Sequence, residues 1–257
     1  LIATNTEYDV IHAHDWLTFI AGVAAKHASG KPLVIHVHAT EIDRSGEHVN
    51  KEVFEIEKYG MEHADKIIAV SHFTKNIIVS KYGIDADKIE VVHNAVEKKH
   101  RLERLGIEKN VKEKIVLFLG RVTMQKGPDY FVEAAYKVLQ KYKNVRFVMA
   151  GSGDLLTRMI LRVASLRMLD KFHFTGFLKG IEVEKMYATS DVYVMPSVSE
   201  PFGISPFEAL LYDVPAIISK QSGVAEVLDN AIKVDFWDID RLAEMMLMLL
   251  EDDELAK

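Results

Sequence analysis

Cysteine is absent from the 257 residues, and this absence excludes several kinds of chemistry. Without cysteine the chain can form no disulfide, no thiolate nucleophile and no cysteine-ligated zinc site. A chain without disulfides fits a reducing compartment, so we expect a cytoplasmic location.

The chain also lacks an excess of positive charge and a long apolar run. Its 32 Lys and Arg residues stand against 38 Asp and Glu residues, so we expect no nucleic acid among its partners. No apolar run approaches the roughly 18 residues of a membrane span, and we expect no transmembrane segment and no signal peptide. The 49% of hydrophobic and 27% of charged residues are typical of a globular protein.

Short apolar runs alternate with longer stretches of helical period, which predicts βα units and parallel sheets. In a first series we expect strands at residues 10–12, 33–38, 66–70 and 89–92. In a second series we expect strands at residues 115–119, 145–150, 172–174, 192–195, 216–219 and 232–234. A polar, charged stretch separates the two series. We therefore predict two α/β domains, at residues 1–98 and 114–257, joined by a linker at 99–113.

Four helix boundaries can be predicted from single residues. Asp15 is expected to cap a helix, and Ser71 to cap another that ends at Tyr82 with Gly83 in the left-handed conformation. Asp240 is expected to begin the last helix, whose apolar residues fall on one face.

A candidate phosphate site follows the strand predicted at 115–119. Gly120 and Arg121 come first, and after a short loop Lys126 and Gly127 precede Pro128, which suits the first position of a helix. Free N–H groups at a helix start, together with two cations, can bind a pyrophosphate. The alternative is a surface arginine and lysine on either side of a turn.

Two carboxylates seven residues apart follow the strand predicted at 192–195. Glu208 can accept hydrogen bonds from the two hydroxyls of a ribose, or it can form a capping box with Ser205. Glu200 lies in the loop itself, where a carboxylate could hold sugar hydroxyls, and Gly203 can let backbone amides approach a ligand.

Gly151 and Gly153 follow the strand predicted at 145–150 and open a helix. The third glycine of a dinucleotide-binding fingerprint is missing because residue 156 is Leu. The pair therefore predicts a tight βα turn near a nucleotide and no more.

Two histidine pairs, His12 with His14 and His36 with His38, lie in the first series of strands. Residues two apart on a strand face the same side, so each pair could chelate a divalent ion, as in a metal-dependent hydrolase. Against this, no cysteine and no second cluster of ligands accompanies the pairs, and a histidine at a strand position is more often simply packed.

Taken together, these motifs resemble the retaining glycosyltransferases of family 4, which have the GT-B fold of two Rossmann-like parallel-sheet domains. The resemblance runs from about residue 9 to residue 250. Glu200 and Glu208 match the family's E-x7-E element, residues 120–127 match its GR-x4-KG element, and residues 222–226 resemble its GGxxE turn. The sequences HAHDW and VHATE resemble the glycogen and starch synthase branch.

The resemblance implies roles for individual residues. Arg121 and Lys126 would neutralise the diphosphate, and Glu208 would hold the ribose. Glu200 and the backbone of Phe202, Gly203 and Ile204 would hold the hexose, with Gly120, Gly151 and Gly153 also at the donor. His38 would lie against the transferring sugar, and Asp15 on the acceptor side.

The resemblance also implies an activity. We expect transfer of a hexose, with glucose as the first candidate, from a nucleotide sugar such as ADP- or UDP-glucose to a saccharide acceptor such as an α-glucan. No metal and no cofactor are expected to be required. The domain at 1–98 would be an incomplete acceptor-side domain, and the domain at 114–257 would bind the donor. A metal-dependent hydrolase, a nucleotide-sugar epimerase and a sugar-nucleotide binding module remain alternatives.

Overall fold

The computed structural model describes residues 5–46, 48–96 and 111–252, and the chain forms two compact units. The first unit comprises Leu1–Asn94 together with Ser199–Phe202, and the second comprises Ala95–Val198 and Gly203–Lys257. Of the linker predicted at 99–113, residues 99–110 lie outside the described residues.

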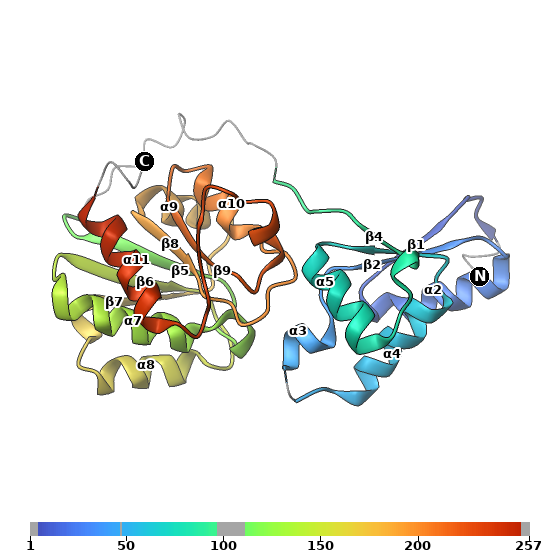
Figure 1. The fold of residues 1–257 in the computed structure, drawn as a ribbon, viewed down its shortest axis with the longest axis horizontal. Coiled ribbons are helices and arrows are strands. Elements are labelled where there is room, and N and C mark those ends of the chain that lie inside the picture. Colours follow the sequence, from blue (N-terminus) through green and yellow to red (C-terminus); the bar gives the residue numbers. More distant parts are fainter. Residues whose placement is uncertain (1–4, 47, 97–110, 253–257) are drawn as a thin grey trace. The chain divides into compact units, whose positions relative to one another are not determined.

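A four-stranded parallel sheet, in the order β1-β2-β3-β4, forms the centre of the first unit (Figure 1). Its strands are β1 (Ile11–His14), β2 (Leu33–Val37), β3 (Lys66–Ala69) and β4 (Ile89–Val91). All four were predicted to within one or two residues. Alternate residues of β2 are buried, because one face of the sheet packs into the apolar core of this unit.

Within the described residues, the α-helices beside this sheet are α2 (Trp16–Ser29), α3 (Glu41–Ser45), α4 (Lys51–His63) and α5 (His72–Ile77). The last continues into a π-helical turn at Ile78–Tyr82. A 3-10 turn at Ala86–Lys88 precedes β4. Helices α3 and α4 were not predicted from the sequence. Thr40 begins α3 with a capping box, since its hydroxyl accepts from the Asp43 N–H and the Asp43 carboxylate accepts from the Thr40 N–H.

The two caps predicted in the first unit have different outcomes. Ser71 caps α5 by accepting from the Thr74 N–H at 2.9 Å, and Gly83 ends the following turn at φ 71°, as predicted. Asp15 precedes α2 but its side chain makes no capping hydrogen bond, so that prediction was wrong. Its carboxylate instead accepts from the backbone N–H of His38 at 2.8 Å.

A six-stranded parallel sheet, in the order β10-β9-β8-β5-β6-β7, forms the centre of the second unit. Its strands are β5 (Lys114–Leu119), β6 (Val145–Ala150), β7 (Phe172–Gly176), β8 (Val192–Met195), β9 (Ala216–Ser219) and β10 (Ile232–Val234). Four of these have the predicted bounds, and β5 and β7 are one and two residues longer. The four residues of β8 are all buried, as expected for a strand covered on both faces.

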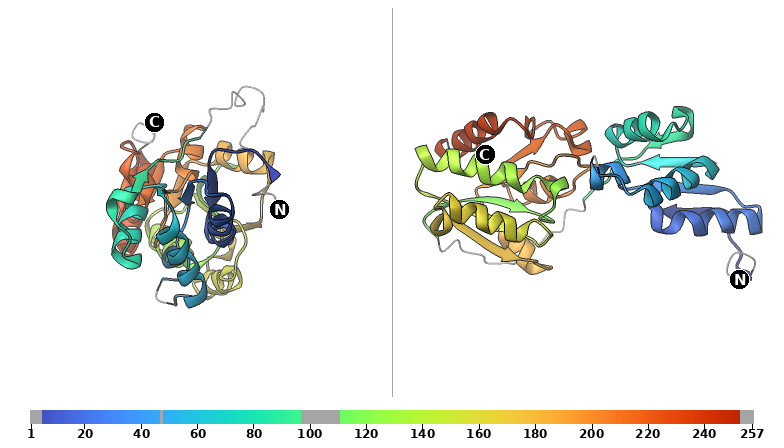
Figure 2. Two further views of the ribbon diagram at one scale, coloured as in Figure 1. Left: turned by 90° about the vertical axis from the view of Figure 1, so that its right-hand side faces the viewer. Right: turned by 90° about the horizontal axis from the view of Figure 1, so that it is seen from below.

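Helices cover both faces of this sheet (Figures 1 and 2). They are α7 (Pro128–Lys141), α8 (Leu156–Ser165), α9 (Ile181–Thr189), α10 (Ser205–Leu210) and α11 (Ile239–Glu251). The buried residues of α7, α8 and α11 share one apolar core, and those of α9 and α10 share the core on the opposite face. The last helix begins at Ile239, one residue before the predicted Asp240, because the Asp238 side chain caps it.

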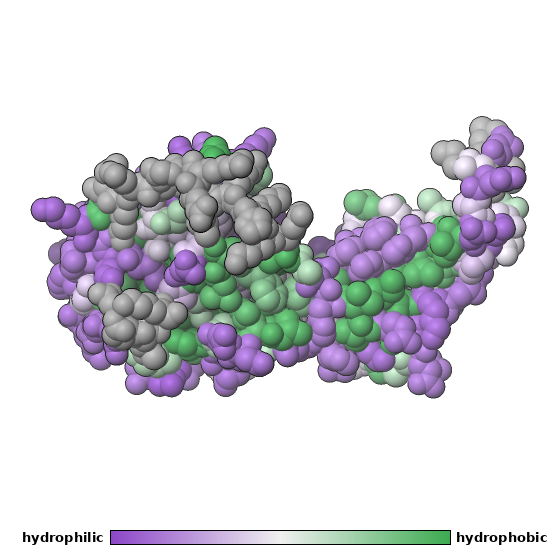
Figure 3. All heavy atoms as spheres, turned by 90° about the horizontal axis from the view of Figure 1, so that it is seen from above, coloured by the Kyte–Doolittle hydropathy of each residue, from purple (hydrophilic) through white to green (hydrophobic). Residues whose placement is uncertain are grey.

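The surface of each unit combines hydrophilic residues with smaller hydrophobic patches, as the face in Figure 3 shows. Within the described residues, no helix combines the length and the apolar character needed to span a bilayer.

The packing of α2 against α4 depends on Gly60. A Cβ atom at this position would lie 2.7 Å from the Cβ atom of Phe19, which is buried. Alanine favours a helix by about 1 kcal/mol over glycine, but the overpacking should cost more, about 1–3 kcal/mol. We therefore expect Gly60→Ala to lower the free energy of unfolding, measured by urea denaturation.

A matched control on the exposed side of α2 is Ala24→Ser. It should change the free energy of unfolding by no more than about 0.5 kcal/mol. Unchanged or increased stability of Gly60→Ala would contradict the close packing.

Candidate functional site

In the second sheet, the strands that follow β5 are added first on one side of it and then on the other. From β5 the chain builds β6 and β7 on one side, and then β8, β9 and β10 on the other. In open parallel sheets, ligands bind beyond the carboxyl ends of the strands at such a switch point. The loops that follow β5, β6 and β8 therefore form the candidate site.

The loop after β5 contains the predicted phosphate element. Arg121 is exposed, and its Nη2 atom donates to the side-chain oxygen of Gln125 at 3.0 Å. Lys126 ends a 3-10 turn, and Gly127 has φ 66°, directly before Pro128 at the first position of α7. The predicted helix start is confirmed. Pro128 has no N–H, and the N–H groups of Tyr130 and Phe131 donate to the Gly127 carbonyl, so within the first turn only the N–H of Asp129 is left for a ligand.

Glycines allow these loops to touch one another through their backbones. A Cβ atom at Gly151 would lie 1.8 Å from the carbonyl oxygen of Gly120, and one at Gly127 would lie 2.0 Å from that of Pro196. A Cβ atom at Gly153 would lie 2.3 Å from the carbonyl oxygen of Val122. No other residue fits these three positions without movement of the backbone. The turn predicted at Gly151 and Gly153 is present, although α8 begins three residues after Gly153.

A cavity of about 460 Å³ opens where these loops meet. It is lined by Leu119, Gly120, Arg121, Ala150, Gly151, Ser152, Phe177, Leu178 and Val183. The structure thus brings together three predicted site residues, Gly120, Arg121 and Gly151, while Lys126, Gly153 and Glu208 are not part of this lining. Arg121 supplies the charge among otherwise mainly apolar walls.

One wall of this cavity, formed by the loop after β7, was not predicted from the sequence. Phe177 is 67% exposed although it is a large apolar residue, and Leu178 comes next to it in the same loop. The available signal in the sequence was an aromatic residue shortly after the strand predicted at 172–174. The strand alone was predicted there, without the loop that follows it.

Glu208 lies in α10, but the capping box predicted for it with Ser205 is not formed. The Tyr187 hydroxyl donates to the Glu208 carboxylate at 3.1 Å, and the Tyr193 hydroxyl donates to the Ser205 hydroxyl at 2.7 Å. Burial raises the pKa of Tyr187 well above its usual value, so this hydroxyl keeps its proton. The carboxylate is therefore oriented by a buried donor from α9.

Glu200 belongs with the first unit, within the segment Ser199–Phe202. The hydroxyl of Ser199 donates to the Asp43 carboxylate at 2.6 Å, and the carbonyl of Pro201 accepts from the hydroxyl of Ser71 at 2.5 Å. Glu200 is only 6% exposed and Phe202 only 2%. Burial, and the charge of Glu200 in addition, raise the pKa of Asp43.

The next two residues of that loop belong to the second unit. Gly203 has φ 92°, a conformation that favours glycine, and Ile204 is exposed just before α10. Their predicted role at a donor hexose stays a prediction.

The two histidine pairs of the first unit form one group, which we call the histidine cluster: His12, His14, His36 and His38. Because β1 and β2 are parallel and His14 is in register with His36, all four rings lie on one face of the sheet. Ring centroids are 4.3 Å apart for His12 and His14, and 4.1 Å apart for His36 and His38. Nδ1 of His14 is 2.9 Å from Nε2 of His38.

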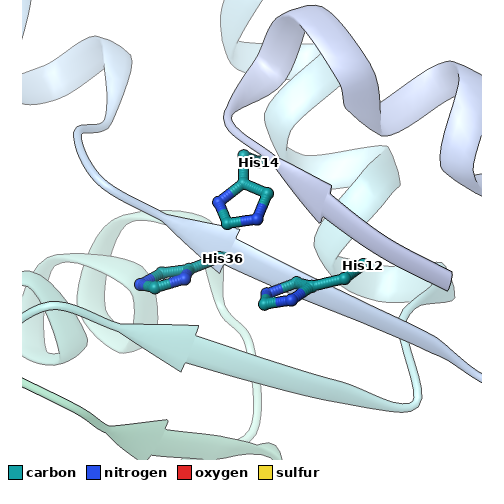
Figure 4. A group of neighbouring side chains, drawn as sticks. All are labelled: His12, His14 and His36. Carbon is teal, nitrogen blue, oxygen red and sulfur yellow. The ribbon is translucent and has the colours of Figure 1, made fainter. Parts of the chain in front are cut away.

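Figure 4 shows His12, His14 and His36 facing one another from β1 and β2. Burial, followed by the charges of the neighbouring histidines, lowers the pKa of His36 to about 4. Burial and the same neighbours also lower the pKa of His12. The His36 ring is therefore neutral at neutral pH.

The predicted site residues of the first unit, His38 and Asp15, are adjacent. The Asp15 carboxylate accepts from the backbone N–H of His38 at 2.8 Å and from that of Ala39 at 3.4 Å. Asp15 therefore fixes the backbone that carries the His38 ring, and the Asp15 backbone itself is held at φ 53°.

Comparison with known families identifies the chain. Residues 101–257 match the family model of the group 1 glycosyl transferases, and residues 1–100 match that of glycosyltransferase family 4. The chain belongs to the group 1 glycosyl transferases. Its resemblance to family 4 and the expected GT-B class, with two Rossmann-like parallel-sheet domains, are confirmed.

Two curated relatives illustrate the range of this glycosyltransferase's similarity. An uncharacterized glycosyltransferase of Methanocaldococcus jannaschii is 34% identical over 241 residues, covering 88% of this chain and 61% of that protein. A glycogen synthase of Mycobacterium tuberculosis is 26% identical over 261 residues, covering 97% of this chain and 62% of that protein. The chain thus spans about three fifths of the length of these relatives.

Solved structures with the same fold include HepE of Anabaena, in complex with UDP and glucose. Its TM-score is 0.83 at 22% identity, covering 99% of this chain and 72% of that chain. Sucrose-phosphate synthase of Thermosynechococcus elongatus has a TM-score of 0.83 at 21% identity, covering 98% of this chain and 67% of that chain.

The lowered pKa of His36 predicts a pH dependence of stability. Its imidazole takes up a proton at about pH 4 in the folded protein, against 6.5 for an unperturbed histidine, so the unfolded state binds more protons between these values. The free energy of unfolding should therefore fall as the pH falls from 6.5 to about 4. Urea denaturation at about pH 7 and about pH 5, with EDTA present, measures the difference.

The variant His36→Gln removes this titration, so its free energy of unfolding should fall less between the two pH values. His173→Gln, an exposed position on β7, should behave as the unchanged protein. Equal decreases for all three proteins would show that His36 is not the group responsible.

Proposed function

We propose that this glycosyltransferase transfers a hexose, in the first instance glucose, from a nucleoside diphosphate sugar to a saccharide acceptor. The observation that carries the proposal is the cavity at the carboxyl ends of β5 and β6, where Arg121 stands beside the backbone of Gly120 and Gly151. Apolar walls suit the flat face of a nucleobase, and the guanidinium suits a diphosphate.

The charges and dipoles at this end of the sheet support a role for the diphosphate as leaving group. Departure of the diphosphate leaves negative charge on its oxygens and positive charge on the anomeric carbon. Arg121, Lys126 and the positive end of the α7 dipole, with the N–H of Asp129, would stabilise the leaving oxygens without reorganising. With these cations at the diphosphate, the transfer requires no metal and no cofactor.

The remaining roles complete the proposed donor and acceptor sites. Glu208, oriented by Tyr187, would hold the ribose hydroxyls. Glu200 and the backbone at 202–204 would hold the hexose, and His38 would lie against the transferring sugar. Gly153 keeps the loop after β6 close to β5, and Asp15 fixes the His38 backbone on the acceptor side.

We propose a transfer with retention of configuration, in which acceptor and leaving group occupy one face of the sugar. The new glycosidic bond forms as the bond to the diphosphate breaks, and the leaving phosphate takes the acceptor's proton. The UDP and glucose bound to HepE, and the glycogen synthase among the relatives, support a nucleotide sugar and a glucan-like acceptor. A hydrolase or an epimerase is not favoured, since both family models are those of transferases.

Binding of a nucleoside diphosphate tests the cavity directly. With EDTA present, calorimetric titration should show that ADP, UDP or GDP binds without a metal. Gly151→Ala should abolish this binding, because the added Cβ atom meets the Gly120 carbonyl and displaces the wall of the cavity.

The control is Gly30→Ala, whose Cβ atom would meet nothing within 4 Å and which also has positive φ. It should bind the diphosphate as the unchanged protein does. If none of the three diphosphates binds to the unchanged protein, the proposed donor site is wrong.

Turnover tests the role of Arg121. Arg121→Ala should lower kcat about 100- to 1,000-fold, the usual effect of removing one group that stabilises charge in the transition state. Initial rates with the nucleotide sugar that binds give kcat and KM separately.

Arg241→Ala is the matched control, because this arginine is exposed on α11 and pairs with Glu244. Its kcat should be unchanged. If Arg121→Ala raised KM and left kcat intact, Arg121 would contribute to binding and not to departure of the diphosphate.

A further inference from the structure

The histidine cluster has the donor set of a transition-metal site. One ring nitrogen each from His12, His14 and His36 lies within 4.8 Å of the other two. Around a tetrahedral zinc ion with bonds of about 2.0–2.1 Å, such nitrogens lie roughly 3.3 Å apart. Rotation of the rings about their side-chain bonds would bring the three nitrogens to that spacing.

A second observation points to a ligand at the same place. Nε2 of His36 is buried and has no hydrogen-bond partner. Buried polar atoms are almost always paired, and an unpaired one requires a reason. A metal ion is a suitable partner for this atom, because a neutral imidazole nitrogen is a common ligand of zinc, nickel and copper.

The hydrogen bond between His14 and His38 assigns the ligand atom of His14. Nδ1 of His14 is occupied by Nε2 of His38, which leaves Nε2 of His14 for the ion. Histidine ligands usually donate their other ring N–H to a neighbouring acceptor, which fixes the ring. His38 can accept that hydrogen bond, so it acts as a positioning residue for His14.

The cluster is both preorganised and accessible. Parallel pairing places His14 opposite His36, and all four histidines share the sheet face that is away from the buried residues Ala13, Ile35 and Val37. His12 and His14 are exposed. An ion can therefore reach the rings from solvent while the strands hold them in place.

We propose that His12, His14 and His36 bind a divalent transition-metal ion, with water completing its coordination. Three imidazoles select zinc, nickel or copper over magnesium and calcium, which prefer oxygen ligands. This site belongs to the first unit, whereas the cavity proposed for the diphosphate belongs to the second. Its existence does not depend on the proposed transferase activity.

The experiment is calorimetric titration of the EDTA-treated, dialysed and tag-free protein with Zn²⁺. We expect one Zn²⁺ ion per chain, and no heat of binding with Mg²⁺. Loss of even an outer partner of a metal ligand weakens binding about 10- to 100-fold, so His12→Gln and His36→Gln should each weaken Zn²⁺ binding at least about tenfold. His12 is exposed, so its variant should fold; far-UV circular dichroism checks both.

Two controls separate this site from weak binding by surface histidines. His173→Gln, on β7, should leave Zn²⁺ affinity unchanged. Co²⁺ bound to the unchanged protein should give the visible absorption of a tetrahedral site, and His12→Gln should lose it. The proposal is overturned if no ion binds, or if His12→Gln and His173→Gln bind Zn²⁺ alike.

Discussion

The second unit depends on close contact between backbones at the carboxyl edge of its sheet. The loop after β5 touches the loop after β6 where Gly151 meets the carbonyl of Gly120, and it touches the loop after β8 where Gly127 meets that of Pro196. A side chain at either glycine would separate the loops. The cavity beside Arg121 and the start of α7 therefore have their positions because two residues have no side chain.

Much of the fold could be predicted because buried strands leave a strong signal in sequence. The runs at 145–150 and 192–195 are apolar nearly throughout, and the structure gives them those bounds. Helices with polar faces were harder to predict. Helix α4 carries six charged residues among 13, so its sequence does not indicate that Gly60 contacts α2. Asp15 does not cap α2 because its carboxylate accepts from another donor, the N–H of His38 just after β2.

The candidate site was predictable only where its determinants are local. The turn at 126–128 needs a left-handed glycine followed by proline, and both are visible in sequence. Ser205 and Glu208 satisfy the local sequence rule for a capping box, but the box is not formed. Their side chains accept hydrogen bonds from two tyrosines of other elements instead. The wall at Phe177 was missed because an exposed aromatic residue has meaning only when its neighbours across the sheet are known.

The histidines show what spacing alone determines and what topology adds. A period of two places His12 with His14, and His36 with His38, on one face, but each strand alone offers only two ligands. Parallel pairing in one register, His14 opposite His36, joins the two pairs into a cluster. A shift of β2 by one residue would turn His36 and His38 to the opposite face. The third ligand of the proposed ion therefore depends on the register of the sheet, which the sequence of neither strand reveals by itself.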